Sequence, residues 1–171
     1  MKPLSEFEQQ ITFSKDSSLS RRSADNYSDK LNTQSSNESF TIEINSADST
    51  SFEQVKGIRK PIAARIIKFR KALGGFYAIA QLKEVYGLKP EIIDSNMVHF
   101  EIDTSSVRKI NINTTDINGL KYHPYIGYSL ANVIIQYRAQ HGNFNSKADL
   151  KKIAIITDNV YEKLIPYITV K

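Results

Sequence analysis

The sequence predicts an all-α protein in which two tandem domains of short helices follow a disordered N-terminal tail. The 171-residue chain repeats itself from residue 42 onward, and each copy places helix-start and helix-stop residues around one long amphipathic run. Strand-like alternation is short and weak. We expect a tail or tether over residues 1–40, a first domain over 41–103, a linker over 104–109 and a second domain over 110–171.

The internal repeat is the strongest feature of the sequence. A shift of 68 residues aligns Ile42–Asp103 with Ile110–Lys171 without a gap. Fourteen positions are identical, mostly apolar or turn residues, as expected if both copies share one core pattern. In the first copy these are Ile42, Ile44, Asn45, Asp48, Ile58, Ala63, Ile66, Ile67, Arg70, Gly74, Phe76, Ala80, Leu82 and Lys83, and in the second copy the residues 68 positions later.

Each copy carries signals for four helices in the same order. Asp48 and Asp116 are the expected N-caps of the first helices, and Gly74 and Gly142 are expected to end the long helices. The predicted helices are 48–55, 61–72, 79–85 and 90–98 in the first copy, and 116–123, 129–140, 147–153 and 158–167 in the second. The alternating segments 41–44, 99–102 and 109–112 are interpreted as extended connectors, and Thr104-Ser105-Ser106 as a hinge.

The N-terminal segment differs in composition from the rest. Residues 1–39 are rich in Ser, Asn, Asp and Gln, with Phe7, Ile11 and Phe13 among their few large apolar residues. Such a segment buries too little apolar surface to offset the entropy lost on ordering, which predicts disorder.

Charge is concentrated in the part that is expected to fold. The chain has a formal net charge of +5 and a pI of about 9.3. Residues 1–40 hold 5 Lys and Arg against 6 Asp and Glu, so residues 41–171 hold 18 against 12. This surplus favours a polyanionic partner. The absence of cysteine excludes disulfides, thiolate metal sites and cysteine nucleophiles.

The stretch from Val55 to Arg70 is the candidate site. A glycine turn at Gly57 leads through Pro61, which suits the first turn of a helix, into an amphipathic run. Its polar positions carry Lys and Arg but no acidic residue. A helix N-terminus with free N–H groups and surrounding cations is suited to bind phosphate.

A shorter echo within each copy predicts four hairpins, each a helix, a tight turn and a second helix. We name them by their turns: hairpin 1 is Val55–Lys60, hairpin 2 is Val85–Pro90, hairpin 3 is His123–Tyr128 and hairpin 4 is Ile153–Asp158.

Both copies contain an ordered set of motifs: an I-N-x-A/T opening, a hairpin, an I-I-x-Y/F-R run and G-x-F. They begin at Ile44-Asn45-Ser46-Ala47 and Ile112-Asn113-Thr114-Thr115, and the arginines that close the runs are Arg70 and Arg138. In this order the motifs resemble the helix-hairpin-helix module of ComEA-type competence proteins, over roughly residues 42–171. The resemblance implies an all-α fold whose hairpin amides hold the DNA backbone without reading base sequence. It also implies roles in DNA uptake or binding outside the cytoplasm, although other proteins of this fold class act in repair or have lost DNA binding.

The hairpins depart unequally from that family's two-glycine pattern. Hairpins 1 and 2 keep their first glycine, hairpin 3 keeps only its second, and hairpin 4 keeps neither and adds Asp158, which would repel phosphate. We therefore expect DNA binding mainly in the first copy. The predicted phosphate-binding residues are Gly57, Ile58, Arg59, Lys60, Ala63, Arg65, Lys68, Gly87, Lys89, Lys121 and Gly127.

The leading prediction is a non-enzymatic protein that binds DNA without sequence preference and needs no cofactor, metal or small-molecule substrate. No nucleophile–base pair or carboxylate cluster is visible, and His123 has no spaced metal-ligating partner. The alternative is a protein–protein scaffold that kept the fold and lost DNA binding, with a partner at the second domain. The second copy's tyrosines (Tyr122, Tyr125, Tyr128 and Tyr137) fit either base stacking or contacts within the core and between domains. No apolar run reaches a membrane span and no signal peptide is seen, so we expect a soluble chain whose compartment is open.

Overall fold

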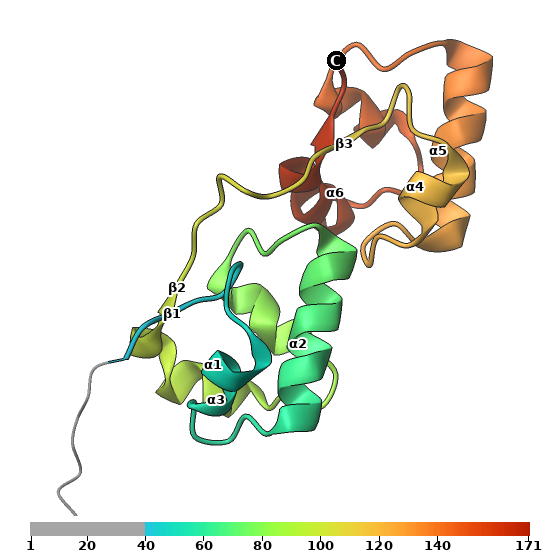
Figure 1. The fold of residues 1–171 in the computed structure, drawn as a ribbon. Helices are drawn as coiled ribbons and strands as arrows, with labels where there is room; N and C mark the ends of the chain where they lie inside the picture. The colour runs from blue at the N-terminus through green and yellow to red at the C-terminus, as the bar shows by residue number, and fades with distance from the viewer. Residues whose placement is uncertain (1–39) are drawn as a thin grey trace, which may run out of the picture. The chain divides into compact units, whose positions relative to one another are not determined.

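The computed structural model describes residues 40–171, and the predicted tail lies outside these residues except for its last residue, Phe40. The first repeat consists of β1 (Ile42–Glu43), α1 (Ser49–Glu53), α2 (Lys60–Leu73), the 3₁₀ helix η1 (Ile79–Glu84), α3 (Pro90–Ser95), η2 (Met97–His99) and β2 (Phe100–Glu101). The second consists of β3 (Ile110–Asn111), α4 (Ile117–Lys121), α5 (Gly127–His141), η3 (Lys147–Lys152), α6 (Asp158–Leu164), η4 (Ile165–Tyr167) and β4 (Ile168–Thr169). The predicted largely helical fold is confirmed (Figure 1).

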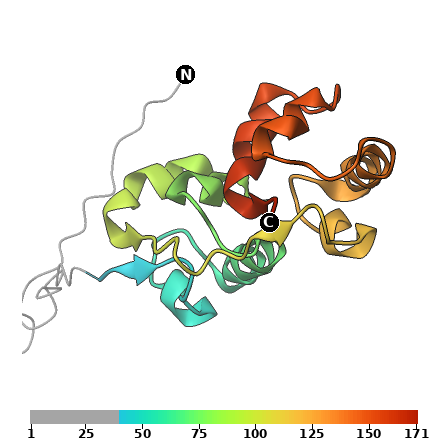
Figure 2. The same ribbon diagram turned by 90° about the horizontal axis from the view of Figure 1, so that it is seen from above.

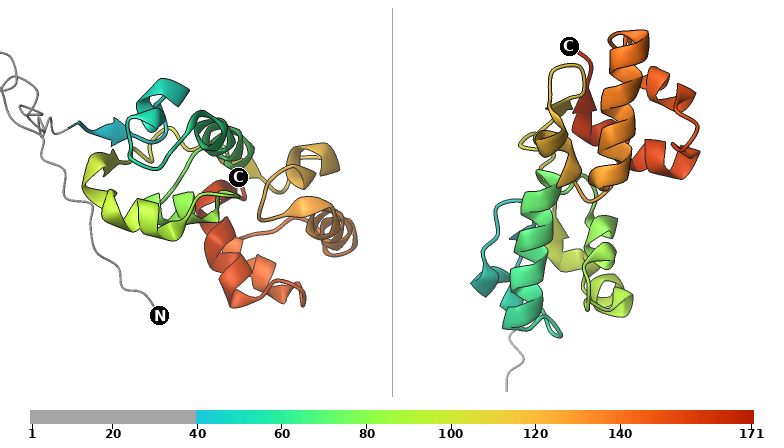
Figure 3. Two further views of the ribbon diagram at one scale, coloured as in Figure 1. Left: turned by 90° about the horizontal axis from the view of Figure 1, so that it is seen from below. Right: turned by 90° about the vertical axis from the view of Figure 1, so that its right-hand side faces the viewer.

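Both repeats have the same internal arrangement. In each, the long helix lies between the short first helix on one side and the 3₁₀ and later helices on the other (Figures 2 and 3). Helix starts follow the predicted capping, because the carboxylates of Asp48 and Asp116 accept the N–H groups of Ser51 and Gly119 at 2.8 and 2.9 Å. Helix α2 ends at Gly74, whose left-handed φ of 84° lets its N–H return to the Arg70 carbonyl.

The segments predicted as extended connectors pair with one another. Strand β1 pairs in parallel with β2, and β3 with β4, each over two residues. The third predicted helix of each copy is a 3₁₀ helix, and the fourth divides into an α-helix and a 3₁₀ turn. These differences are local, because short segments switch between such forms at small energetic cost.

Two polar residues that are identical in both copies, an asparagine and an arginine, form the same hydrogen bonds in each repeat. The amide of Asn45 bonds both the N–H and the carbonyl of Phe76, and Asn113 does the same to Phe144. The guanidinium of Arg70 donates to the carbonyls of Ile44 and Ala47 at 2.9 and 2.7 Å. Arg138 repeats this pattern on Ile112 and Thr115.

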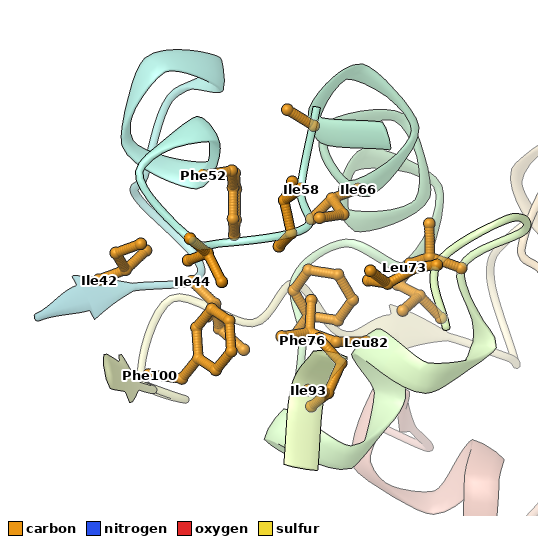
Figure 4. Packing of buried hydrophobic residues seen from close by; sticks show 14 of the residues in the cluster. Ile42, Ile44, Phe52, Ile58, Ile66, Leu73, Phe76, Leu82, Ile93 and Phe100 are labelled. Atoms are coloured by element: carbon orange, nitrogen blue, oxygen red, sulfur yellow. The ribbon is translucent and has the colours of Figure 1, made fainter. Parts of the chain in front are cut away.

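The core of the first repeat is formed by side chains from every element of the repeat except η2. Ile44, Phe52, Ile66 and Phe76 are fully buried and point toward one another (Figure 4). The segment 104–109, predicted as a linker, is attached to this core: Val107 is buried in it, and the Arg108 N–H donates to the Gly74 carbonyl at 2.8 Å.

Polar contacts join the two repeats. The side chain of Gln81 bonds the hydroxyls of Tyr125 and Tyr167 at 2.9 and 2.7 Å, and Lys163 pairs with Glu84 at 3.1 Å. Tyr167 is fully buried and belongs to the first repeat's core cluster. Tyr125 is therefore a contact between repeats, as one reading of the tyrosine cluster predicted, and Tyr137 stacks on Phe144 within the second repeat. Tyr122 and Tyr128 remain exposed.

Candidate nucleic-acid interface

Hairpin 1 presents free backbone donors at the start of α2. Gly57 adopts a φ of 101°, and the Ile58 N–H closes the turn onto the Val55 carbonyl at 2.9 Å. Arg59 then enters α2 in an extended conformation and has no side-chain cap. Among the described residues, the N–H groups of Gly57, Arg59 and Lys60 have no acceptor. This end of α2 can therefore accept an anion.

Hairpin 2 repeats this geometry. Gly87 has a φ of 82°, the Leu88 N–H donates to the Val85 carbonyl at 3.0 Å, and Lys89 is an extended N-cap without a side-chain bond. Pro90 occupies the first helical position. Glu91 stands in the first turn of α3, so this hairpin carries less positive charge than hairpin 1.

The two hairpins pack on each other reciprocally. A β-carbon on Gly57 would lie 2.9 Å from the Ile92 Cδ1 atom, and one on Gly87 would lie 3.4 Å from the Ile62 Cδ1 atom. Each glycine thus faces an isoleucine in the helix that follows the other hairpin. In both cases this isoleucine lies five residues after the glycine of its own hairpin. Glycine is needed at both turns for the positive φ, at Gly57 also for the approach of Ile92, and at Gly87 also for the approach of Arg65 Nη1, which would lie 2.5 Å from a β-carbon.

Arg65 holds hairpin 2 in place. Its guanidinium donates to the Tyr86 carbonyl at 3.2 Å and lies over the Tyr86 ring, 5.2 Å from its centre. The Tyr86 ring is 84% exposed, so it projects from the tip of the hairpin. Arg65 is exposed as well as tethered, and its charge faces solvent beside the turn.

Exposed cations surround hairpin 1. Lys56, Arg59 and Lys60 lie at the turn, and Lys68 lies two helical turns along α2. No ion pair engages any of them among the described residues. Because α2 contains no acidic residue, nothing on this helix offsets their field.

In hairpin 3, two backbone N–H groups are hydrogen-bonded within the turn itself. The His123 carbonyl accepts the Gly127 N–H at 3.0 Å, and His123 Nδ1 accepts the Tyr125 N–H at 3.3 Å. These two donors correspond to the free N–H groups of Arg59 and Gly57 in hairpin 1. Desolvation on burial lowers the pKa of His123 to about 4, so its imidazole is neutral at pH 7 and Nδ1 is free to accept.

Hairpin 4 is closed by its own side chains. The Thr157 hydroxyl caps α6 by accepting the Val160 N–H at 3.3 Å. Asp158 pairs with Lys151 at 2.8 Å in the first helical turn. A capped helix start with a carboxylate at its mouth is unfavourable for phosphate.

The structure gathers most of the predicted residues at hairpins 1 and 2. Ile58 and Ala63 are buried and their N–H groups are donated to Val55 and Arg59, so they shape the turn. Gly57, Arg59, Lys60, Arg65, Lys68, Gly87 and Lys89 are exposed. Lys121 and Gly127 lie apart in the second repeat, with the Lys121 ammonium over the Tyr122 ring at 4.9 Å.

Sequence reasoning missed the part that His123 plays. Its only signal was position: His123 aligns with Val55 after the 68-residue shift, so a hydrogen-bonding ring replaces an aliphatic core residue beside a hairpin. Tyr86 was likewise overlooked, although it replaces Lys56 in the echo between hairpins 1 and 2.

The described residues show neither a metal centre nor a membrane span. Within residues 40–171, no group of three His, Asp or Glu side chains is placed to hold a metal ion. No helix in this range is long and apolar enough to cross a bilayer.

Comparison with known proteins agrees with the repeated hairpins. A family model for the helix-hairpin-helix motif matches the chain twice, over residues 38–100 and 105–169. The chain belongs to the helix-hairpin-helix family. Each match spans nearly all of one repeat and thus includes both of its hairpins.

Three relatives extend this result. The chain is 37% identical over 62 residues to ComE operon protein 1 of Bacillus subtilis, a match covering 36% of this chain and 30% of the relative. It is 28% and 24% identical to Endonuclease/exonuclease/phosphatase family domain-containing protein 1 of Danio rerio and Xenopus laevis. Those matches cover 72% of this chain but 26% of each relative. The ComEA-like resemblance is thereby confirmed, and the chain spans about a quarter of the length of the two vertebrate proteins.

Proposed function

We propose that this helix-hairpin-helix protein binds DNA through backbone phosphates, without sequence preference, mainly by its first repeat. The observation that carries the proposal is the pair of matching hairpins in that repeat, each with free amides beside exposed cations. The match to ComE operon protein 1 supports it. The ComEA-type resemblance fits a role in DNA uptake or competence, and it is compatible with a location outside the cytoplasm.

The mechanism follows from the order of groups along hairpin 1. A phosphate oxygen at the start of α2 would accept N–H groups of Arg59 and Lys60, in the field of the helix dipole. The side chains of Arg59, Lys60 and Lys68 would neutralise neighbouring phosphates. Hairpin 2 would take the other strand through Gly87 and Lys89. The second repeat, in which the Tyr125 and Gly127 N–H groups are bonded within hairpin 3, would contribute at most a weak contact through Gly127 and Lys121.

Sequence preference should be slight, because phosphate contacts carry no base information. About three to five such contacts would make log affinity fall with log salt at a slope near −3 to −4. The proposal contains no catalytic step: the activity in the names of the two vertebrate relatives is said of those proteins, and this chain matches about a quarter of each.

The test is a fluorescence-anisotropy titration of labelled duplexes of two unrelated sequences between 50 and 200 mM salt. Wild type should bind both equally and lose affinity steeply with salt. Arg59→Glu with Lys60→Glu should abolish most binding at 50 mM. Lys109→Glu with Lys171→Glu changes charge equally away from the hairpins and serves as the control. Absence of binding at low salt, or binding insensitive to the hairpin pair, would contradict the proposal.

A second candidate, a protein contact at the second repeat, draws on its exposed apolar side chains. Tyr122, Tyr128 and Ile155 are 73%, 66% and 54% exposed at hairpins 3 and 4. Tyr122→Ser with Tyr128→Ser separates the two uses of this face. Unchanged duplex affinity in that variant would favour a protein contact for the two tyrosines. A loss of duplex affinity would instead show that they contact DNA.

A further inference from the structure

An open hollow of about 510 Å³ lies at the C-terminal end of α2, at the opposite end from hairpin 1. Its lining includes Arg70, Lys71, Gly74, Gly75, Ser106 and Arg108, three of which are cationic. It joins the end of the long helix to the segment that connects the repeats. None of the predicted DNA-binding residues belongs to it.

The positive charge of this hollow comes chiefly from two side chains. Arg70 is directed onto the carbonyls of Ile44 and Ala47 and feels the charge of Glu43. Lys71 and Arg108 are exposed, and no ion pair engages either among the described residues. The hollow therefore carries about two side-chain charges without an ion-pair partner, which outweigh the roughly half negative charge at the C-terminal end of α2.

The position of Arg108 depends on Gly74. A β-carbon on Gly74 would lie 3.2 Å from Arg108 Cβ and 3.6 Å from its Nε. The Arg108 side chain therefore crosses the end of α2 through the space left by the absence of a side chain on Gly74. The Arg108 N–H bond to the Gly74 carbonyl fixes this crossing. At the equivalent Gly142 nothing lies within 4 Å, and Ala139 replaces Lys71. The basic hollow is a feature of the first repeat alone.

A line of lysines connects the hollow to hairpin 1. Lys60, Lys68 and Lys71 are spaced by eight and three residues, which places them on one solvent-facing side of α2. At 1.5 Å per residue, Lys71 stands about 16 Å from Lys60 along the helix. The corresponding residues of α5 are Tyr128, Gln136 and Ala139, which carry no charge.

We propose that the hollow is a second phosphate-binding site, which holds a backbone phosphate of the same nucleic acid that hairpin 1 grips. The hydroxyl of Ser106 and the cationic groups of Lys71 and Arg108 would hold the phosphate, because the Gly74 and Gly75 amides are already donated to Arg70. A spacing of about 16 Å corresponds to roughly five base steps of a duplex whose axis follows the helix. The assignment of the ligand rests on the proposed DNA binding.

The first experiment measures the salt dependence of duplex binding for Lys71→Gln with Arg108→Gln in the full chain. Removing the contact with this one phosphate should reduce the slope of log affinity against log salt by about 1. Lys109→Gln with Lys171→Gln removes the same charge outside the hollow and should leave the wild-type slope. Equal slopes for the two pairs would overturn the proposal. Thermal melting verifies that both variants are folded.

The second experiment needs no DNA. Inorganic phosphate titrated into labelled protein should shift the amide NMR signals of Gly74, Gly75 and Ser106 in wild type but not in the Lys71→Gln, Arg108→Gln variant. Absence of shifts in wild type, or shifts that persist in the variant, would overturn the site. If wild type fails to bind duplex yet shows these shifts, the proposed function fails, the site stands and the nucleic-acid ligand is overturned in favour of a free phosphate compound.

Discussion

Gly57 of hairpin 1 lies against Ile92 of α3, with space for no β-carbon, since one would stand 2.9 Å from the Ile92 Cδ1 atom. At Gly87 a β-carbon would stand 2.5 Å from Arg65 Nη1, while the Ile62 Cδ1 atom lies at an ordinary contact distance of 3.4 Å. The turns whose amides are proposed to bind a phosphate are thus also the contacts by which the two hairpins pack. Stability and the proposed binding therefore involve the same glycines.

Gly57→Ala should lower the free energy of unfolding by about 2–3 kcal/mol, because it adds both a strained positive φ and an overlap with Ile92. Gly127→Ala is the matched control. Gly127 has a φ of 62° but nothing within 4 Å, so only the φ strain of about 1 kcal/mol applies. Urea unfolding of both variants gives the comparison. Equal losses would show that the contact with Ile92 carries no energetic weight.

Arg70→Met should destabilise the protein by about 2–3 kcal/mol, since the carbonyls of Ile44 and Ala47 lose their charged donor in a partly buried place. Its neighbour Lys71 is exposed and makes no such bond, so Lys71→Met should change the unfolding free energy by less than about 0.5 kcal/mol. Chemical denaturation measures both. A small effect at Arg70 would mean that water replaces the guanidinium.

Gln81→Ala should weaken the contact between repeats. The hydroxyls of Tyr125 and Tyr167 both lose their partner, and Tyr167 is fully buried, which predicts a loss of about 1–3 kcal/mol. In calorimetry we expect one transition for wild type and a broadened or divided transition for the variant. Gln140→Ala, at an exposed position of α5, is the control. A single unshifted transition in Gln81→Ala would refute the coupling.

Stability should fall on mild acidification because of His123. Burial lowers its folded pKa to about 4, below the ordinary value of 6.5, so the unfolded chain binds the additional proton. The stabilisation is present above pH 6.5 and is lost as the pH falls toward 4, by up to about 3 kcal/mol. His123→Asn keeps an acceptor for the Tyr125 N–H but does not titrate.

The measurement for His123 is the unfolding free energy at intervals between pH 7 and pH 4. Wild type should lose stability over this range, and His123→Asn should show a much flatter profile, whatever its absolute stability. The lowered pKa values of Asp48 and Asp116, caused by hydrogen bonds from backbone N–H groups, affect stability at more acidic pH. Parallel pH profiles for the two proteins would show that His123 does not cause the loss of stability between pH 7 and pH 4.

Much of this protein could be predicted from the sequence. The 68-residue repeat defined both copies, because a shared core demands the same apolar residues at the same spacing, and Asp48 and Gly74 marked helix ends through their own local chemistry. The unequal charge of the copies was visible as well, with Arg59 and Lys60 opposite Gly127 and Tyr128.

Only the tertiary structure decided which amides are free. Hairpins 1 and 3 align in sequence, yet the imidazole and carbonyl of His123 take up the donors that hairpin 1 leaves open. The bond from Gln81 to Tyr167 and the crossing of Arg108 over Gly74 were equally hidden. Residue spacing specifies which face of a helix is apolar, but the partner of a polar group depends on turn geometry and on residues distant in the chain. The sequence by itself therefore determined the repeated fold, and the packing decided that hairpin 1 leaves open the two N–H donors that hairpin 3 uses within its own turn.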